Sequence, residues 1–196
     1  MEKKDLKPAG VFKYFEEICQ VPRPSKKEEK MIAYLKAFGA KHNLETKVDE
    51  AGNVLIKKPA TPGKENLQTV VLQSHIDMVC EKNNDVQHDF LTDPIETEID
   101  GEWLKAKGTT LGADNGIGVA TELAILSDDS IEHGPLECLF TVDEETGLTG
   151  AFELKEGFMS GDILLNLDSE DEGEIFIGCA GGIDSVAEFA YKEVEV

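Results

Sequence analysis

The stretch Thr69–Asp77 reads TVVLQSHID, so an apolar strand runs directly into a histidine and an aspartate. A nearly continuous apolar strand is typical of a sheet that is covered on both faces. His75 and Asp77 are two residues apart, and in extended chain their side chains share a face. The pair could combine a metal ligand with its orienting carboxylate, because metal-bound histidines usually hydrogen-bond through the second ring nitrogen. A hydrogen-bonded structural histidine is the alternative.

Strands and helices alternate on both sides of this stretch. Apolar residues at helical spacing predict a helix over residues 9–20, a second that ends near His42, and a third over residues 117–126. Ser25 and Glu28 form an S-x-x-E capping box for the second helix. Strands are predicted over residues 44–49, 53–57, 69–73, 136–142, 163–167 and 175–177, and a hairpin over residues 96–107. This order favours a mixed α/β sheet covered by helices, in which ligands gather at strand ends.

Two adjacent glutamates, Glu144 and Glu145, follow the apolar run Leu136–Phe140 and precede a glycine-bearing turn. Adjacent carboxylates at the end of a buried strand repel each other and resist desolvation. A shared cation would relieve this repulsion, with one carboxylate as ligand and its neighbour as base. A solvated acidic turn is the alternative.

Two further acids occupy similar positions. Asp114 lies among four glycines in the run Gly108–Gly118, at the start of a helix. The run lacks the G-K-[ST] of a phosphate-binding loop, and an Asp N-cap is the alternative for Asp114. Asp168 ends the strand of residues 163–167 and could equally be a turn-former.

His75, Asp114, Glu145 and Asp168 together form a candidate ligand set. Carboxylates combined with imidazole suit Zn²⁺, Mn²⁺ or Co²⁺. One bridging carboxylate can hold two such ions roughly 3.5–4 Å apart. Glu144, beside a ligand, would then accept the proton of a metal-activated water. Separate structural roles for these residues are the alternative.

Composition excludes several partners. The chain has 196 residues and a net charge of -21, which should repel nucleic acid and anionic membranes. No apolar run is long enough to cross a membrane, and the N-terminus lacks the apolar core of a signal peptide. Four widely spaced cysteines suit reduced thiols in a cytoplasm. We therefore expect a cytoplasmic protein that binds neither nucleic acid nor membrane.

The motifs taken together resemble the di-zinc exopeptidases, which include aminoacylases, glutamate carboxypeptidases and cytosolic dipeptidases. Within this group the chain is most similar to the aminoacyl-histidine (Xaa-His) dipeptidases. The similarity covers nearly the whole chain and rests on four motifs in the right order: Ser74–Val79, Gly108–Gly118, Asp143–Ala151 and Leu167–Glu170.

This resemblance implies a role for each residue. Asp114 would bridge two metal ions, zinc before manganese or cobalt. His75 and Asp168 would complete one metal site, and Glu145 would belong to the other. Asp77 would orient His75, and Glu144 would be the general base. A cis peptide is also implied after the bridging aspartate, between Asp114 and Asn115.

The resemblance also implies a three-layer α/β/α catalytic domain over residues 1–182, with an inserted lid domain beginning at residues 183–196. The chain would then be the N-terminal part of a longer enzyme, inactive or impaired by itself. The last ligand of the second metal site would be a histidine nearer the C-terminus of that enzyme. His42, His88 and His133 lie outside the matching motifs.

The implied activity is hydrolysis of short peptides, Xaa-His dipeptides among them, by an enzyme that dimerises when full-length. A related metal-dependent deacylase or aminopeptidase is one alternative. A non-catalytic metal-binding fragment is another.

Overall fold

A five-stranded mixed sheet lies at the centre of the computed structural model, which describes residues 3–169, 171, 173–178, 181 and 185–192. The strand order is β1-β2-β6-β3-β7. The strands are β1 (Glu45–Val48), β2 (Val54–Lys58), β3 (Val70–His75), β6 (Leu136–Thr141) and β7 (Ile163–Asn166). β1, β2 and β6 pair antiparallel, whereas β6, β3 and β7 pair parallel. The mixed α/β sheet predicted from the sequence is therefore confirmed.

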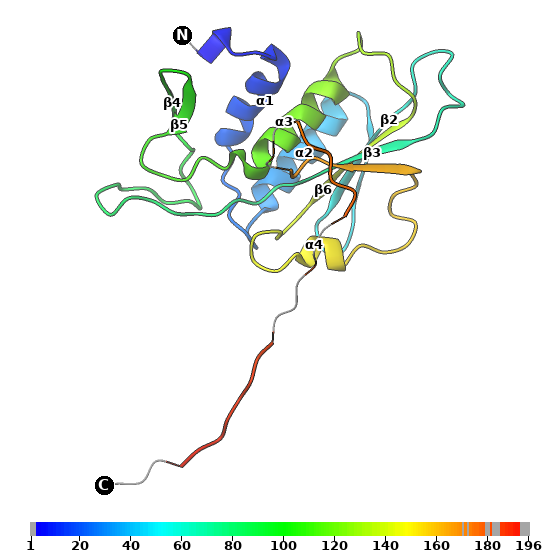
Figure 1. Cartoon of the computed structure of the whole chain (residues 1–196). Helices are drawn as coiled ribbons and strands as arrows, with labels where there is room; N and C mark the ends of the chain where they lie inside the picture. The colour runs from blue at the N-terminus through cyan, green and yellow to red at the C-terminus, as the bar shows by residue number, and fades with distance from the viewer. Residues whose placement is uncertain (1–2, 170, 172, 179–180, 182–184, 193–196) are drawn as a thin grey trace.

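Three helices pack on one face of this sheet (Figure 1). They are α1 (Ala9–Cys19), α2 (Glu29–Lys41) and α3 (Ala113–Ser127), and a single 3-10 turn, η1 (Lys3–Asp5), precedes them. Alternate residues of the central strands, such as Ile56, Leu72 and Phe140, meet the apolar faces of the helices in one buried cluster. This cluster is the main core of the fold.

The opposite face of the sheet carries a smaller cluster. Leu55, Val71 and Leu139 are buried there under Leu154 and Phe158, which follow the short helix α4 (Thr149–Phe152). Within the described residues, the second covering layer of the expected three-layer fold consists of this short helix and the segment after it.

The parallel strands end at one edge of the sheet. In the register of β3 with β6, His75 lies opposite Thr141, and Gln73 of β3 lies opposite Asn166 of β7. Because parallel strands share their direction, the residues that follow these three strands emerge side by side. A separate hairpin, β4 (Thr97–Asp100) and β5 (Trp103–Ala106), was predicted from the sequence and is present.

Two sequence predictions are wrong. Residues 175–177 form no strand, and the side chains of Ile175 and Ile177 are almost fully exposed. The expected capping box is also absent. Glu28 is the N-cap of α2 but makes no side-chain cap hydrogen bond, and Ser25 donates its hydroxyl hydrogen bond to Asp77.

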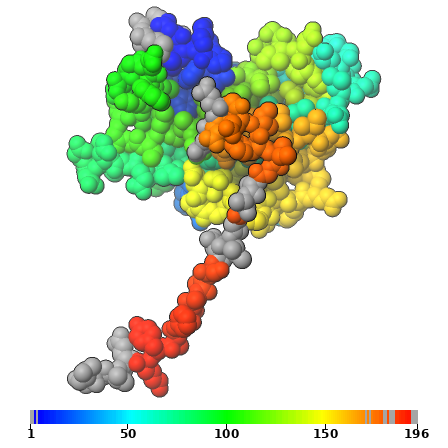
Figure 2. All heavy atoms as spheres, viewed as in Figure 1, coloured from blue at the N-terminus to red at the C-terminus, as the bar shows by residue number. Residues whose placement is uncertain are grey.

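The predicted domain boundary between residues 182 and 183 lies outside the described residues. Residues 185–192 contain no helix or strand, and Figure 2 shows their red segment leading away from the body. Across the described part of the chain, every helix is too short or too polar to span a bilayer.

Candidate metal centre

The edge where β3, β6 and β7 end collects every candidate ligand. His75 is the last residue of β3 and is almost completely buried. Its Nε2 atom lies 2.9 Å from Asp114 Oδ1 and 3.7 Å from Asp168 Oδ1. The same nitrogen lies 3.9 Å from Glu144 Oε2. Residues that are far apart in the sequence therefore converge on one imidazole nitrogen.

Two overlapping groups of potential ligand atoms share this histidine. His75, Asp114 and Asp168 form the first group, and His75, Glu144 and Glu145 form the second. In each group the ligand atoms lie within 4.8 Å of one another. The four residues proposed as ligands from the sequence are thus brought together, and the predicted base lies among them.

Asp77 connects the histidine to the glutamate pair. Its side chain has no exposed surface, and its Oδ1 lies 3.2 Å from His75 Nδ1. Oδ1 accepts a hydrogen bond from the Glu144 amide (3.0 Å). Oδ2 accepts one from the Glu145 amide (3.2 Å) and one from Ser25 Oγ (2.7 Å). One carboxylate therefore fixes the histidine relative to both glutamates.

The start of α3 supplies Asp114 through an unusual backbone. The peptide bond between Asp114 and Asn115 is cis, as the resemblance implied, and both residues have non-helical dihedrals. Gly112 precedes them with φ +69°, a left-handed conformation that glycine adopts readily. The buried Asn115 donates from Nδ2 to Asp168 Oδ1 at 2.7 Å, which ties the helix start to the end of β7.

Close approach of α3 to β3 is possible because Gly118 has no side chain. A Cβ at this position would lie 3.1 Å from Ser74 Cβ and would collide with the Asn115 side chain. The glycine-rich run around Asp114 therefore serves backbone packing, and Asp114 itself remains half exposed at the mouth of the site.

The acids of the site raise one another's proton affinity. Burial is the largest cause that raises the pKa of Glu144, Glu145 and Asp168, and neighbouring carboxylates raise it further. Burial lowers the pKa of His75, but Asp77 and Asp114 outweigh it and raise that pKa to about 9. This pattern indicates an excess of negative charge at one point.

The donor set fits a divalent metal ion. Among the described residues, no lysine or arginine forms an ion pair with Asp114, Glu144, Glu145 or Asp168, and the basic partner of Asp114, Glu144 and Asp168 is His75. One imidazole nitrogen and several carboxylate oxygens from rigid strand ends match the ligand types of zinc and related metals. The residues present can therefore hold such an ion.

Arg23, which sequence reasoning missed, lies buried beneath the site. Its Nη1 donates to the carbonyl oxygens of Ile76 (3.1 Å) and Asp77 (2.9 Å), and its Nη2 donates to that of Gly112 (2.5 Å). Its hydrogen bonds therefore tie the end of β3 to the start of α3. The sequence signal beside it is the proline pair at residues 22 and 24, which predicts only an interruption between two helices.

Residues 71–190 match the peptidase family M20/M25/M40, over more than half of the chain and across all the proposed ligands, Asp77 and Glu144. The chain belongs to this family. Family M20 peptidases depend on metal ions, in agreement with the ligand cluster at the strand ends.

Two relatives share more than half of the aligned residues. The cytosol non-specific dipeptidase of Escherichia coli is 53% identical over 183 residues, which are 93% of this chain and 38% of that protein. The crystal structure of aminoacylhistidine dipeptidase from Vibrio alginolyticus superposes with a TM-score of 0.89 and 55% identity, over 91% of this chain and 36% of the other. The chain thus spans little more than a third of the length of these relatives.

The chain also resembles a more distant solved structure. The aminopeptidase PepT of Bacillus cereus superposes with a TM-score of 0.70 and 26% identity, over 83% of this chain and 43% of the other.

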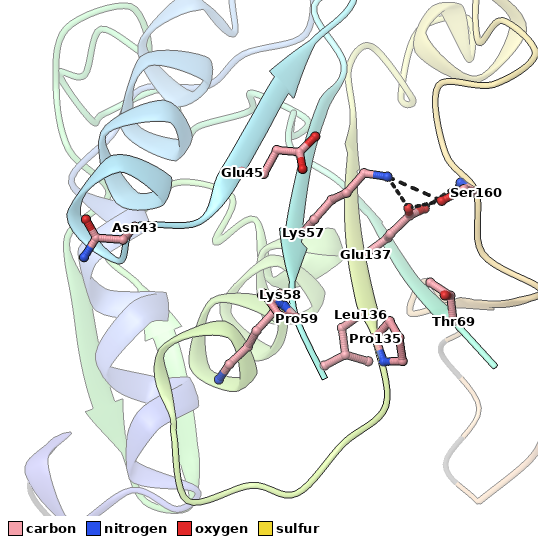
Figure 3. Close-up of a pocket in the computed structure, with 10 residues that line it drawn as sticks. All are labelled: Asn43, Glu45, Lys57, Lys58, Pro59, Thr69, Pro135, Leu136, Glu137 and Ser160. Carbon is pink, nitrogen blue, oxygen red and sulfur yellow. Dashed lines mark hydrogen bonds and ion pairs between the residues drawn. The ribbon is translucent and has the colours of Figure 1, made fainter. Parts of the chain in front are cut away.

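A pocket of about 470 Å³ in this M20 chain lies at the opposite edge of the sheet, away from the ligand cluster (Figure 3). Three of its polar residues pair with one another. Lys57 Nζ lies 2.5 Å from Glu137 Oε1, and Ser160 donates to both oxygens of Glu137. These three residues therefore form a network of their own, separate from the ligand cluster.

Proposed function

We propose that the whole protein is a metal-dependent dipeptidase that hydrolyses short peptides, dipeptides with C-terminal histidine among them. Membership of the M20 family supports a peptidase, and the names of the E. coli and V. alginolyticus relatives support a dipeptidase. The observation that carries the proposal is the convergence of Asp114, Glu144 and Asp168 on the Nε2 atom of His75.

His75, Asp114, Glu145 and Asp168 are proposed as the ligands, and Asp114 as the one shared between two ions. Zinc is the proposed metal, because imidazole and carboxylate are its common partners; Mn²⁺ and Co²⁺ accept the same donors. Bound metal would polarise the substrate carbonyl and lower the pKa of a water molecule.

Glu144 is proposed as the general base. Burial and the neighbouring acids raise its pKa, so its carboxylate has more affinity for a proton than an ordinary glutamate. Its Oε2 would take the proton of the attacking water and deliver it to the leaving amine. Asp77 Oδ1 lies 3.2 Å from His75 Nδ1 and also accepts the Glu144 amide, so Asp77 is proposed as the residue that orients His75.

The proposal is tested with the full-length protein and a panel of peptides. We expect release of histidine from Xaa-His dipeptides, loss of turnover with a chelator, and recovery when zinc is added back. Turnover that is unaffected by complete metal removal would contradict the proposal.

The structural likeness to the B. cereus aminopeptidase favours a second candidate, an aminopeptidase with the same metal centre. Tripeptides in the same panel distinguish the two. A dipeptidase leaves tripeptides intact, whereas the second candidate removes their N-terminal residue.

A small peptide is thus the proposed partner, and the E. coli relative's name supports a cytoplasmic location. The exclusion of nucleic acid and membrane, and a homodimer of the whole protein, stay predictions.

A further inference from the structure

The loop that joins α1 to α2 passes directly beneath the metal centre. We call residues Arg23–Glu28 of this loop the bracing loop. Pro24 forms a parallel bridge with Met78, just after β3, which places the bracing loop alongside the end of that strand. Arg23, Ser25 and Glu28 then reach three of the four segments that carry the proposed ligands and base.

Ser25 acts on the carboxylate that orients the histidine. Its Oγ donates to Asp77 Oδ2 at 2.7 Å, the shortest of the hydrogen bonds that Asp77 accepts. The same oxygen also accepts the Glu145 amide. Loss of the hydroxyl would leave Asp77 with one donor on each oxygen and a less restricted orientation towards His75.

Glu28 acts on the backbone that carries the glutamate pair. Its side chain is buried, and Oε1 accepts hydrogen bonds from the Asp143 amide (3.0 Å) and the Lys26 amide (2.9 Å). Asp143 has φ +49° and Lys26 has φ +64°, both left-handed conformations that cost energy in residues with a Cβ. The Glu28 carboxylate therefore holds two strained turns, one at Lys26 and one at Asp143. The turn at Asp143 leads directly into Glu144.

Burial of the Glu28 carboxylate costs free energy, which its hydrogen bonds to the two turns offset. Its carboxylate shares a fully buried cluster with those of Asp77 and Asp143, within 4.8 Å. Helix capping does not account for it, because α2 has no side-chain cap hydrogen bond. The contacts of Ser25 and Glu28 lead to the metal centre, not to the helix that follows them.

We propose that Ser25 and Glu28 are positioning residues of the metal centre. Ser25 sets the Asp77 carboxylate that orients His75, and Glu28 sets the turn that presents Glu144 and Glu145. The inference rests on the proposed function, since the centre that these residues position is the proposed dipeptidase site.

The first test measures the zinc dissociation constant of the full-length protein by chelator competition, well below the melting temperature. We expect Ser25→Ala and Glu28→Ala to weaken binding by about 10–100-fold, the usual effect of removing an outer-shell partner. Ser25→Thr and Glu28→Gln keep a hydroxyl and an acceptor oxygen, and should restore most of the affinity.

Matched controls separate positioning from general destabilisation. Ser130→Ala removes a serine–aspartate hydrogen bond far from the site, between Ser130 Oγ and Asp128 Oδ1. Glu137→Ala removes a buried glutamate that accepts the Ser160 amide at the opposite edge of the sheet. Both should lower the melting temperature without changing the affinity for zinc.

The second test needs no metal. Amide hydrogen exchange of the metal-free protein should show faster exchange at Asp143 in Glu28→Ala and at Glu145 in Ser25→Ala, with α3 unchanged. Unaltered exchange at these amides, together with zinc affinities within twofold of the parent, would overturn the inference. A parent protein that binds no zinc would instead overturn the proposed function, and the exchange rates would still decide the roles of Ser25 and Glu28.

Discussion

Asp77 and Glu144 are neighbouring carboxylates with opposite environments. Burial raises the pKa of Asp77, but His75, Ser25 and the Glu144 amide outweigh it and lower that pKa to about 2. Within the part of the chain that the structure describes, Glu144 accepts no such set of donors, and burial with nearby acids raises its pKa. Such a separation supports the proposed roles, which are orientation of His75 for Asp77 and proton transfer for Glu144.

Replacing Glu144 tests whether its carboxylate accepts the proton of the attacking water. We expect Glu144→Gln to reduce kcat by about 10²–10⁴-fold, the usual contribution of a general base. Bound metal should remain, because the proposed ligands are unchanged. Steady-state kinetics and metal analysis of the same preparation provide the measurement, and wild-type turnover in the variant would remove Glu144 as base.

Replacing Asp77 tests the orienting role. The Asp77 carboxylate accepts hydrogen bonds from Ser25 Oγ and from the Glu144 and Glu145 amides. Asp77→Asn keeps only one acceptor oxygen, and its NH₂ group, itself a donor, would face at least one of these donors. We expect zinc affinity to fall by about 10–100-fold.

Asp49 provides the matched control for Asp77. It also accepts several backbone amides, those of Ala51, Gly52 and Asn53, but in the turn between β1 and β2. Asp49→Asn should reduce stability and leave zinc affinity unchanged. Equal losses of affinity in the two variants would show that Asp77 has no special connection to the metal centre.

At the scale of elements, the sequence predicted most strands and helices because their apolar patterns are local. Residues 136–142 and 163–167, for example, coincide closely with β6 and β7. The capping box failed because Ser25 donates to Asp77, 52 residues away, and Glu28 accepts the Asp143 amide, 115 residues away, as well as the Lys26 amide. No local pattern distinguishes a hydroxyl that caps a helix from one that contacts a distant carboxylate.

The helix α3 contains a second buried acid that the sequence did not single out. Glu122 is completely buried between α3 and the sheet, beside Ser74 and Cys138. Within the described residues, neither of its carboxyl oxygens has a hydrogen-bond partner that meets normal geometry. Burial therefore raises the pKa of Glu122 well above its ordinary value, although Ser74 and Cys138 lower it in part.

This burial predicts a loss of stability with rising pH. The unfolded chain releases the proton near a pKa of about 4.3, whereas folded Glu122 retains it to higher pH. Between those two pKa values the folded state binds more protons, so the free energy of unfolding falls as pH rises. Glu122→Gln should flatten this decline and raise the free energy of unfolding at pH 8, because the glutamine has no proton to lose on unfolding.

Urea unfolding of the metal-free protein between pH 5 and pH 8 measures this effect. Glu132→Gln, at an exposed position, is the control and should follow the parent. Parallel pH profiles for the parent and Glu122→Gln would show that Glu122 does not carry the dependence.

At the scale of the whole molecule, the site joins segments from residue 75 to residue 168. The residues of the site could be predicted because the parallel strands end at one edge of the sheet. Polar side chains that follow several of these strands therefore lie close together. The supporting contacts of Arg23, Ser25 and Asn115 could not be predicted, because they depend on how α1, α2 and α3 pack against that edge.

Because the site joins distant segments, metal binding should stabilise the whole fold against unfolding. An ion that binds only the folded state at 100 times its dissociation constant adds about 2.7 kcal/mol to the free energy of unfolding. We expect a chelator to lower the melting temperature of the full-length protein and zinc to restore it. His75→Ala is the control, and a chelator should leave its melting temperature unchanged.

The metal content of the purified full-length protein tests the two-metal centre most directly. Elemental analysis should give two equivalents of divalent metal per chain in the parent, and a clear loss in Asp114→Asn, because Asp114 is the ligand proposed to be shared. A parent with no bound metal after zinc loading, or full occupancy in Asp114→Asn, would contradict the account.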